Sequence, residues 1–289
     1  MTYYVGNVLV TEKNESTHWL TLLYTSLCGP ALRYIMSQPW VARIAGIYND
    51  SWLSKHHIAS FCKQYNITLD DFVVPPGGYR SFNDFFTRKL KPGARAMDQT
   101  PTALVSPADS KLYVIPNISA DTMFFIKQKA LNLEQFLQDK QAAQAYTNGT
   151  MLVFRLAPYD YHRFHFPTDC IPSAAKKISG ILESVNPLVF KTAVQPLLTN
   201  QRQLLYLKTK HFDTIAMVAV GAMMVGTIID SYTPDIMHKK GDQAGYFAFG
   251  GSTVVLLFKQ GCITIAPEIV KHSLAGYETA VLVGQRITE

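Results

Sequence analysis

Three short stretches of the sequence hold side chains that could take part in catalysis. Residues 159–167, YDYHRFHFP, carry His162 and His165 beside aromatic rings and an arginine. Residues 250–253, GGST, place Ser252 directly after two glycines, and residues 106–110, SPADS, carry Asp109 in a turn. Serine, histidine and aspartate are the types that supply a nucleophile, a base and an orienting carboxylate, although a sequence does not show that they meet in space.

Each stretch also has a structural interpretation, and the residues alone leave both open. Two histidines three residues apart can be hydrogen-bonded core groups, and a Gly-Gly pair between strand-like runs can be a bulge or bend. The functional alternative for GGST is that an exposed glycine carbonyl lies next to the Ser252 hydroxyl, which attacks it. The motif is not the GxSxG elbow of hydrolases. We expect no metal site, because no cysteine or glutamate close in sequence joins the two histidines as a third ligand.

The composition of the chain limits the classes of protein to which it can belong. The chain has 289 residues, of which 48% are hydrophobic and 17% charged, so it can bury a large core. Its net charge of +6 suits an anionic partner such as phosphate or an acidic lipid surface. Nucleic acid is not expected, because no helix-turn-helix, zinc-finger or RNA-recognition signature accompanies the basic residues. Four widely spaced cysteines and a start without a signal or transit pattern predict a cytoplasmic protein.

The N-terminal part of the chain predicts short apolar helices. Residues 16–42 are rich in Trp, Tyr and Leu and are interrupted by Pro30 and Pro39. They either lie in a membrane interface, pack on the protein's own core or meet a second subunit. A further helix is expected over 51–65, and the Pro- and Gly-rich loop after it predicts a boundary that separates a helical region, 1–76, from a catalytic domain, 77–289. The longest uncharged apolar-rich run, 214–229, is shorter than the ~20 residues of a spanning helix.

The remainder predicts a short basic segment followed by strands. Residues 79–98 concentrate arginine and lysine and are either a solvated face or a contact with phosphate headgroups. Within them, Ser81 and Asp84 resemble a helix-capping box. Beyond Thr102, runs such as LYVIP, MLVFRL, LLYLKT and TVVLLF alternate with turn residues, which predicts a mostly antiparallel β architecture. One helix is expected over 133–146, with Asn132 as its N-cap. The fold class is therefore α+β, with short N-terminal helices beside a compact β-rich catalytic body.

Taken together and in chain order, several segments resemble the phosphatidylserine decarboxylases, from about Leu27 to Phe258. The segments are YRSFNDFFTRKLKPGAR, SPADSKL, RLAPYDYHRFHFPTD, SVNP, VGAMMVG and KGDQAGYFAFGGSTVVLLF. The resemblance implies a self-processing enzyme in which Ser252 attacks the carbonyl of Gly251 and becomes a covalent pyruvoyl group. The implied products are a β chain, 1–251, and an α chain, 252–289. By the same matching, His165 is the base for Ser252, Asp109 orients it, and His162 acts in decarboxylation.

The resemblance also implies the setting of the reaction. The implied substrate is phosphatidylserine, and the implied products are phosphatidylethanolamine and carbon dioxide. The pyruvoyl ketone would serve as the electron sink, so no bound organic cofactor is required. It implies a peripheral protein on the cytoplasmic face of a bacterial-type cell membrane, with the two chains held together and assembled into a higher homo-oligomer. Tyr159 stands where the family usually has Arg or Gln. The alternatives are a pyruvoyl decarboxylase of a free amino acid, an unprocessed serine hydrolase and a non-catalytic membrane-binding protein.

Overall fold

A computed structural model describes residues 2–12, 17–119, 121–124, 129–190, 195–223, 227–250 and 252–289, and its central element is one large sheet. The strands of that sheet are β1 (Thr2–Val5), β2 (Val8–Thr11), β3 (Ser110–Ile115), β6 (Thr150–Leu156), β8 (Cys170–Pro172), β9 (Lys176–Ile178), β10 (Arg202–Thr209), β11 (Thr214–Val220), β14 (Ser252–Phe258) and β15 (Glu278–Val281). Their order is β2-β1-β15-β3-β6-β14-β11-β10-β8, with β9 also paired to β10. Neighbours run antiparallel except β1 and β15, which are parallel.

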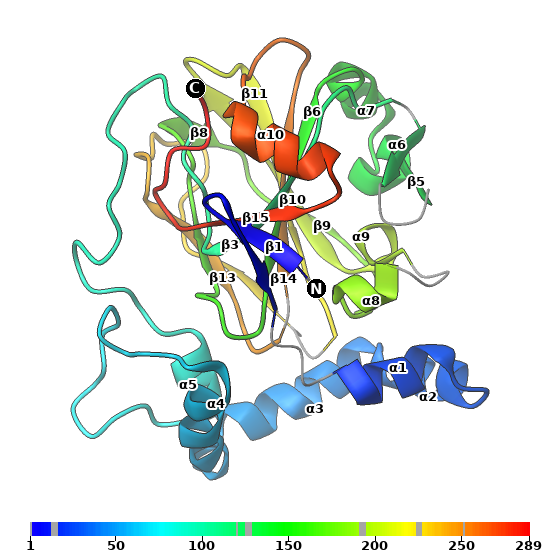
Figure 1. Ribbon diagram of the computed structural model, residues 1–289, viewed down its shortest axis with the longest axis vertical. Coiled ribbons are helices and arrows are strands. Elements are labelled where there is room, and N and C mark those ends of the chain that lie inside the picture. The colour runs from blue at the N-terminus through cyan, green and yellow to red at the C-terminus, as the bar shows by residue number, and fades with distance from the viewer. Residues whose placement is uncertain are drawn as a thin grey trace.

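Two smaller sheets and a set of short helices complete the fold (Figure 1). One sheet joins β7 (Arg163–His165), β12 (Ile228–Asp230) and β13 (Gln243–Phe247), and the other joins β4 (Asp121–Phe124) and β5 (Lys129–Asn132). The helices are α1 (Thr17–Thr25), α2 (Gly29–Met36), α3 (Pro39–Asp50), the 3-10 helix η1 (Trp52–His56), α4 (His57–Tyr65), α5 (Phe82–Phe86), α6 (Leu133–Leu137), α7 (Lys140–Tyr146), α8 (Pro187–Phe190), α9 (Pro196–Thr199) and α10 (Pro267–Leu274).

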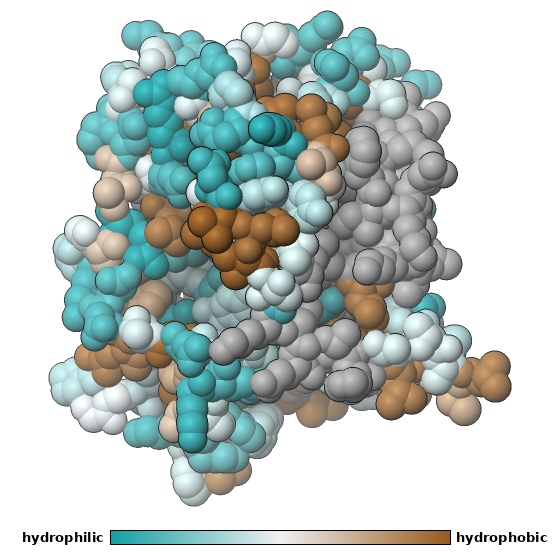
Figure 2. Space-filling view, in the orientation of Figure 1, coloured by the Kyte–Doolittle hydropathy of each residue, from teal (hydrophilic) through white to brown (hydrophobic). Residues whose placement is uncertain are grey.

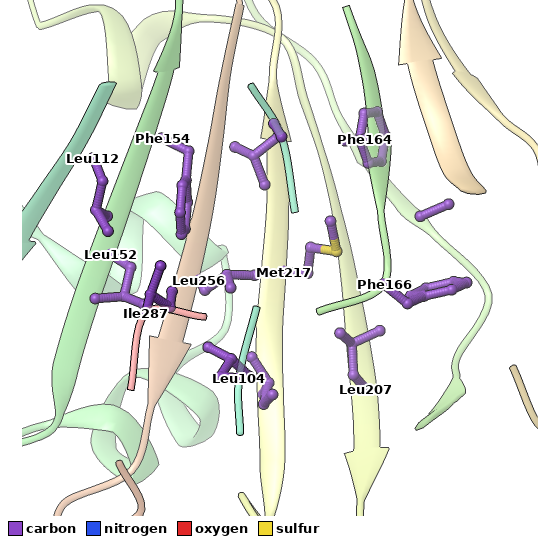
Figure 3. Close-up of a cluster of buried hydrophobic side chains, with 14 of the residues drawn as sticks. Leu104, Leu112, Leu152, Phe154, Phe164, Phe166, Leu207, Met217, Leu256 and Ile287 are labelled. Atoms are coloured by element: carbon purple, nitrogen blue, oxygen red, sulfur yellow. The ribbon is translucent and has the colours of Figure 1, made fainter. Parts of the chain in front are cut away.

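Apolar clusters lie on both faces of the large sheet, and β14 contributes side chains to both of them. Alternate residues of a strand point to opposite faces, so Leu256 joins one apolar cluster and Val255 the other. Figure 3 shows the first cluster, in which Leu152 and Phe154 lie beside Leu256 on the neighbouring strand. Every residue of β14 is buried. The strand that begins at Ser252 is therefore held by hydrogen bonds on both edges and by packing on both faces.

The predicted α+β class is confirmed, and several elements match their predictions closely. The helix expected over 51–65 is η1 followed by α4, which ends at Asn66 in a left-handed conformation. The predicted cap forms, since Ser81 Oγ accepts the Asp84 N–H at 3.1 Å. The four strand-like runs named above become β3, β6, β10 and β14.

One predicted helix is divided in the structure, and the domain boundary expected at 76/77 stays a prediction. The helix expected over 133–146 is two helices, because Gln138 adopts a left-handed conformation and the Asp139 side chain then caps a new start by accepting the Ala142 N–H at 3.0 Å. Ahead of α1, β1 pairs with β15 and joins the first strands to the large sheet. The expected 76/77 boundary also crosses a shared apolar cluster, in which Phe61 of α4 packs on α5.

The basic segment 79–98 is divided between internal and surface roles. Arg80, Lys89 and Lys91 are exposed. Arg88 is buried and stacks on the rings of Phe72 and Phe85. Part of the positive charge of this segment is therefore buried in the fold, and the exposed arginine and lysines remain available to an anionic surface.

Phe85 tests whether the cluster that joins α4 and α5 stabilises the whole fold. Its side chain is fully buried among Tyr79, Phe61 and Phe82. Phe85→Ala should lower the free energy of unfolding by about 3–5 kcal/mol, because it leaves a cavity. Chemical denaturation of uncut protein measures this, with the exposed Trp52→Ala as control. Equal stability of both variants would show that the cluster contributes little.

Candidate active site

The Ser252 hydroxyl and the His162 imidazole meet at the start of β14. His162 Nδ1 lies 3.1 Å from Ser252 Oγ, and both residues are fully buried. The contact arises from strand register, because Ser252 pairs with Leu156, the last residue of β6, and His162 lies just beyond the turn that follows β6. The Phe86 ring stacks on the imidazole at 4.0 Å between centroids and covers its face. The predicted serine and one of the two predicted histidines are thus brought together.

The neighbours of His162 determine which of its nitrogens carries the proton. His162 Nε2 lies 3.0 Å from the Ala157 carbonyl oxygen. A carbonyl can only accept, so Nε2 carries the hydrogen and Nδ1 of the neutral ring is left as an acceptor for the Ser252 hydroxyl. Burial lowers the pKa of His162 to about 3, and the nearby Arg88 charge acts in the same direction. The ring is therefore neutral at ordinary pH, and its Nδ1 can accept the hydrogen bond of the Ser252 hydroxyl.

A turn rich in hydrogen bonds holds the Ala157 carbonyl in place. The Asp160 N–H also donates to that oxygen at 2.9 Å, and the Asp160 carboxylate accepts the Ala157 N–H at 2.7 Å. Lys111 lies 2.7 Å from both Asp160 carboxylate oxygens, and Arg88 donates to the carbonyls of Tyr159 and Asp160. Burial raises the pKa of Asp160, which the Lys111 charge opposes. Asp160 and Lys111 therefore position His162 through the backbone.

His165 and Asp109 hydrogen-bond to groups other than Ser252, which differs from the expected serine–histidine–aspartate arrangement. His165 Nδ1 donates to the Gly241 carbonyl at 2.8 Å, so Nε2 is the acceptor and receives the Tyr161 hydroxyl at 3.1 Å. The Asp109 carboxylate accepts from Arg95 at 2.7 Å and from the Val283 N–H at 2.8 Å. Burial lowers the pKa of His165. In this structure Ser252 is thus hydrogen-bonded to His162, whereas His165 is bonded to Tyr161.

The reason lies in the backbone. The His165 N–H donates to the Pro107 carbonyl at 2.8 Å, which ties β7 to the turn that carries Asp109. His162 precedes β7 and lies in the turn region next to β14. The two imidazoles therefore bond to different partners, while the bond to Pro107 keeps His165 close to the turn that carries Asp109.

The glycine pair lies where β14 begins. Gly250 has φ +128°, a conformation that favours glycine, which agrees with the prediction that backbone freedom is needed here. Gly251 lies outside the described residues, so the predicted scissile bond itself is not placed. Its neighbours on both sides are placed, and they bring the Ser252 hydroxyl to a base.

A cavity of about 200 Å³ adjoins this end of the sheet. It reaches Gly250 and the 157–159 turn, and its wall includes apolar side chains from α1 and α4. Its charged lining residues are Glu12 and Arg155, which pair at 3.1 Å, and Arg155 also binds Glu278 at 2.6 Å. The cavity is therefore a mainly apolar chamber with one internally paired charge cluster.

Sequence reasoning did not identify Asp160, Lys111, Tyr161 or the Ala157 carbonyl. Asp160 was visible beside the histidines, and Pro158 was a turn signal that could have indicated a fixed carbonyl. Lys111 gave no signal, because its pairing depends on β3 lying next to β6. Among the described residues, no group of three or more His, Cys, Asp or Glu side chains is arranged to hold a metal ion.

Comparison with known proteins places the chain in a family. The family model for phosphatidylserine decarboxylase matches residues 82–289. A protein of Chlamydia pneumoniae named phosphatidylserine decarboxylase proenzyme is 39% identical over 270 residues, covering 93% of this chain and 89% of its own. Proteins with the same name from Clostridium novyi and Fusobacterium nucleatum are 38% and 39% identical, each covering 96% of this chain and 94% and 92% of their own.

The chain belongs to the phosphatidylserine decarboxylase family. The predicted membership is thereby confirmed. The family match begins at α5 and includes all the candidate site residues, whereas α1 to α4 precede it.

The proton positions in the two histidines can be tested directly. In uncut Ser252→Ala protein, nitrogen-15 NMR should show hydrogen on Nε2 of His162 and on Nδ1 of His165, since the carbonyls that fix them remain. Because burial depresses its pKa, His162 should stay neutral as the pH is lowered to 5, where an unperturbed histidine with a pKa of ~6.5 is mostly charged. A His162 ring that titrates near 6.5, or two identical tautomers, would contradict this geometry.

Proposed function

We propose that this chain is a phosphatidylserine decarboxylase proenzyme that cuts itself between Gly251 and Ser252. The observation that carries the proposal is the hydrogen bond between the Ser252 hydroxyl and the neutral imidazole of His162, whose Nδ1 is the acceptor. Ser252 directly follows a Gly-Gly pair in the sequence. Family membership supports the substrate, because the similar proteins from three bacterial genera carry the name phosphatidylserine decarboxylase proenzyme.

His162, which contacts Ser252, supplies the first proton transfer that cleavage needs. His162 Nδ1 takes the proton from Ser252 Oγ, and the oxygen attacks the Gly251 carbonyl carbon. The proton passes to the departing Ser252 nitrogen, so the peptide becomes an ester. A base then removes the α-hydrogen of Ser252 as a proton, the C–H electron pair forms a carbon–carbon double bond, and the Gly251 carboxylate leaves with the electrons of the ester C–O bond. Water converts the resulting enamine to a ketone and releases ammonia, which gives a new chain end at residue 252.

The site fits the pyruvoyl group that this sequence of steps produces. The new end remains at the start of buried strand β14, beside His162 and near the cavity that reaches Gly250. The ketone supplies an electron sink for decarboxylation of an amine-bearing carboxylate. His162 is placed to hold or return a proton there, and the Phe86 ring helps to exclude water from its face.

The first helices favour action at a lipid surface. Apolar side chains project from α1, α2, α3 and η1, and Figure 2 shows several at the end of the α1–α2 pair that extends from the body. The most exposed are Leu22, Tyr34, Ile44, Ile47 and Trp52 on these helices and Leu27 in the turn between α1 and α2. Within the described ranges, no helix has the length and hydropathy to cross a bilayer. We infer peripheral binding to the cytoplasmic face of an anionic membrane, with the headgroup entering the cavity beside α1.

Intact mass spectrometry tests the cut. Purified protein should separate under denaturing conditions into chains 1–251 and 252–289, with the smaller bearing the mass of an N-terminal pyruvoyl group, whereas Ser252→Ala stays whole. The processed protein should release carbon dioxide from phosphatidylserine vesicles. Release from free amino acids alone would instead favour the amino-acid decarboxylase, and an uncut chain that hydrolyses esters would favour the hydrolase.

The two histidines separate the processing base from other roles. Because His162 contacts Ser252, His162→Ala should slow processing by at least about 100-fold, the range of general-base catalysis. His165→Ala should be cleaved faster than His162→Ala, because His165 does not contact Ser252 in this structure. The time course of cleavage in freshly synthesised chains measures both rates. The reverse order would mean that Ser252 leaves His162 and meets His165 before it reacts, as the family resemblance implies.

The membrane-facing helices can be tested without altering the site. Ile44 and Ile47 are 60% and 73% exposed on α3. The double change Ile44→Glu and Ile47→Glu should weaken sedimentation with anionic vesicles at least tenfold, because two apolar anchors become negative charges. Cleavage should be unchanged. Leu274→Glu on α10, where the leucine is 56% exposed, is the matched control. Equal losses in both proteins would show that α3 is not the docking surface.

A further inference from the structure

The SVNP motif, residues 184–187, forms part of the cavity wall but has no place in the cleavage chemistry. Ser184, Val185 and Asn186 line the cavity together with Trp19 and Leu20 of α1. The residue before the motif, Glu183, has a side chain that is only 4% exposed. Its surroundings therefore determine how this wall is held.

The backbone of Glu183 is fixed to the catalytic body. The fully buried Asn200 side chain accepts the Glu183 N–H at 2.8 Å and donates to the Glu183 carbonyl at 2.7 Å. The same amide donates to the Gly221 carbonyl at 2.7 Å, and the Met223 N–H donates to the Glu183 carbonyl at 3.2 Å. Met223 also lines the cavity. This part of the wall is consequently anchored by its own main chain.

The side chain of Glu183 reaches the helices that precede the family-matched region. Its carboxylate accepts the Tyr24 hydroxyl at 2.5 Å and lies 3.3 Å from Arg33 Nε. The Tyr24 oxygen in turn accepts the Ser184 N–H at 3.1 Å. Tyr24 is four residues after Leu20, so the two side chains leave the same face of α1. A single buried carboxylate thus connects α1 and α2 to the cavity wall.

We propose that Glu183 is a positioning residue that holds α1 over the cavity and so shapes the pocket that receives the substrate headgroup. This inference rests on the proposed function. Burial raises the pKa of Glu183, while the Tyr24 hydrogen bond and the Arg33 charge oppose that rise. Removal of a partner leaves a buried acceptor unsatisfied, so the helix that carries Trp19 and Leu20 is held less tightly. The consequence is weaker substrate binding without loss of the reacting groups.

Tyr24→Phe tests the role in processed enzyme, because it removes one hydroxyl and keeps the ring. The substrate should be a short-chain phosphatidylserine below its micelle concentration, so that vesicle affinity does not contribute. KM should rise by roughly three- to tenfold, as expected for the loss of one hydrogen bond to a buried carboxylate. The kcat should stay within about twofold, and self-cleavage should match that of the unaltered chain.

A matched variant and a second site keep the test decisive. Tyr206→Phe also removes a buried tyrosine hydroxyl, but one without a hydrogen-bond partner in the described structure, and its KM should not change. Arg33→Met removes the other Glu183 partner at a half-exposed position and should raise KM in the same direction if Tyr24→Phe folds poorly. An unchanged KM in both Glu183-partner variants, or a fall in kcat alone, overturns the inference. Failure of the unaltered protein to cut itself or release carbon dioxide would instead reject the proposed function.

Discussion

The chemistry of the site depends on one hydrogen bond, from His162 Nε2 to the Ala157 carbonyl. It compels the neutral ring to present an acceptor nitrogen to Ser252, a task that a carboxylate performs in familiar serine triads. The Ala157 carbonyl belongs to the backbone, so its position is set by the conformation of the 157–160 turn and not by a side-chain rotamer. Asp160 secures that turn by bonding the Ala157 N–H, and Lys111 balances the charge of Asp160. The orientation of one imidazole therefore depends on the pairing of β3 with β6.

The same end of the sheet receives residues from distant parts of the chain. Arg155 of β6 binds Glu12, which follows β2, and Glu278 of β15. Although burial disfavours the charge, the two carboxylates hold the pKa of Arg155 above its ordinary value. Loss of one partner would leave a buried charge incompletely compensated, which is costly. The first strands and the last strand are thus coupled at the cavity, and the helices between them are attached nearby through Glu183.

The sequence predicted what depends on local pattern. Alternation identified β6 and β14, the Ser81 cap was visible from its spacing, and GGST marked the point where β14 begins. The resemblance assigned His165 to Ser252, whereas His162 lies against it in the structure, because that contact depends on the register between Ser252 and Leu156. The motif resemblance named the participating residue types, but the contacts of His165 with Gly241 and Tyr161 arise from backbone placement. Local spacing therefore located the residues of the site but did not show which of them hydrogen-bond to one another.

The position of the proposed cut has a mechanical consequence. Residues 252–289 contain β14, which pairs with β6 on one edge and β11 on the other, and β15, which pairs with β1 and β3. A chain that begins at residue 252 would lose one peptide bond but keep these ladders and the burial of every β14 side chain. Because separation would expose a central strand on both faces, the two chains should stay associated without a covalent link. Cleavage at a strand terminus can thus create a new chemical group while the surrounding fold keeps it in place.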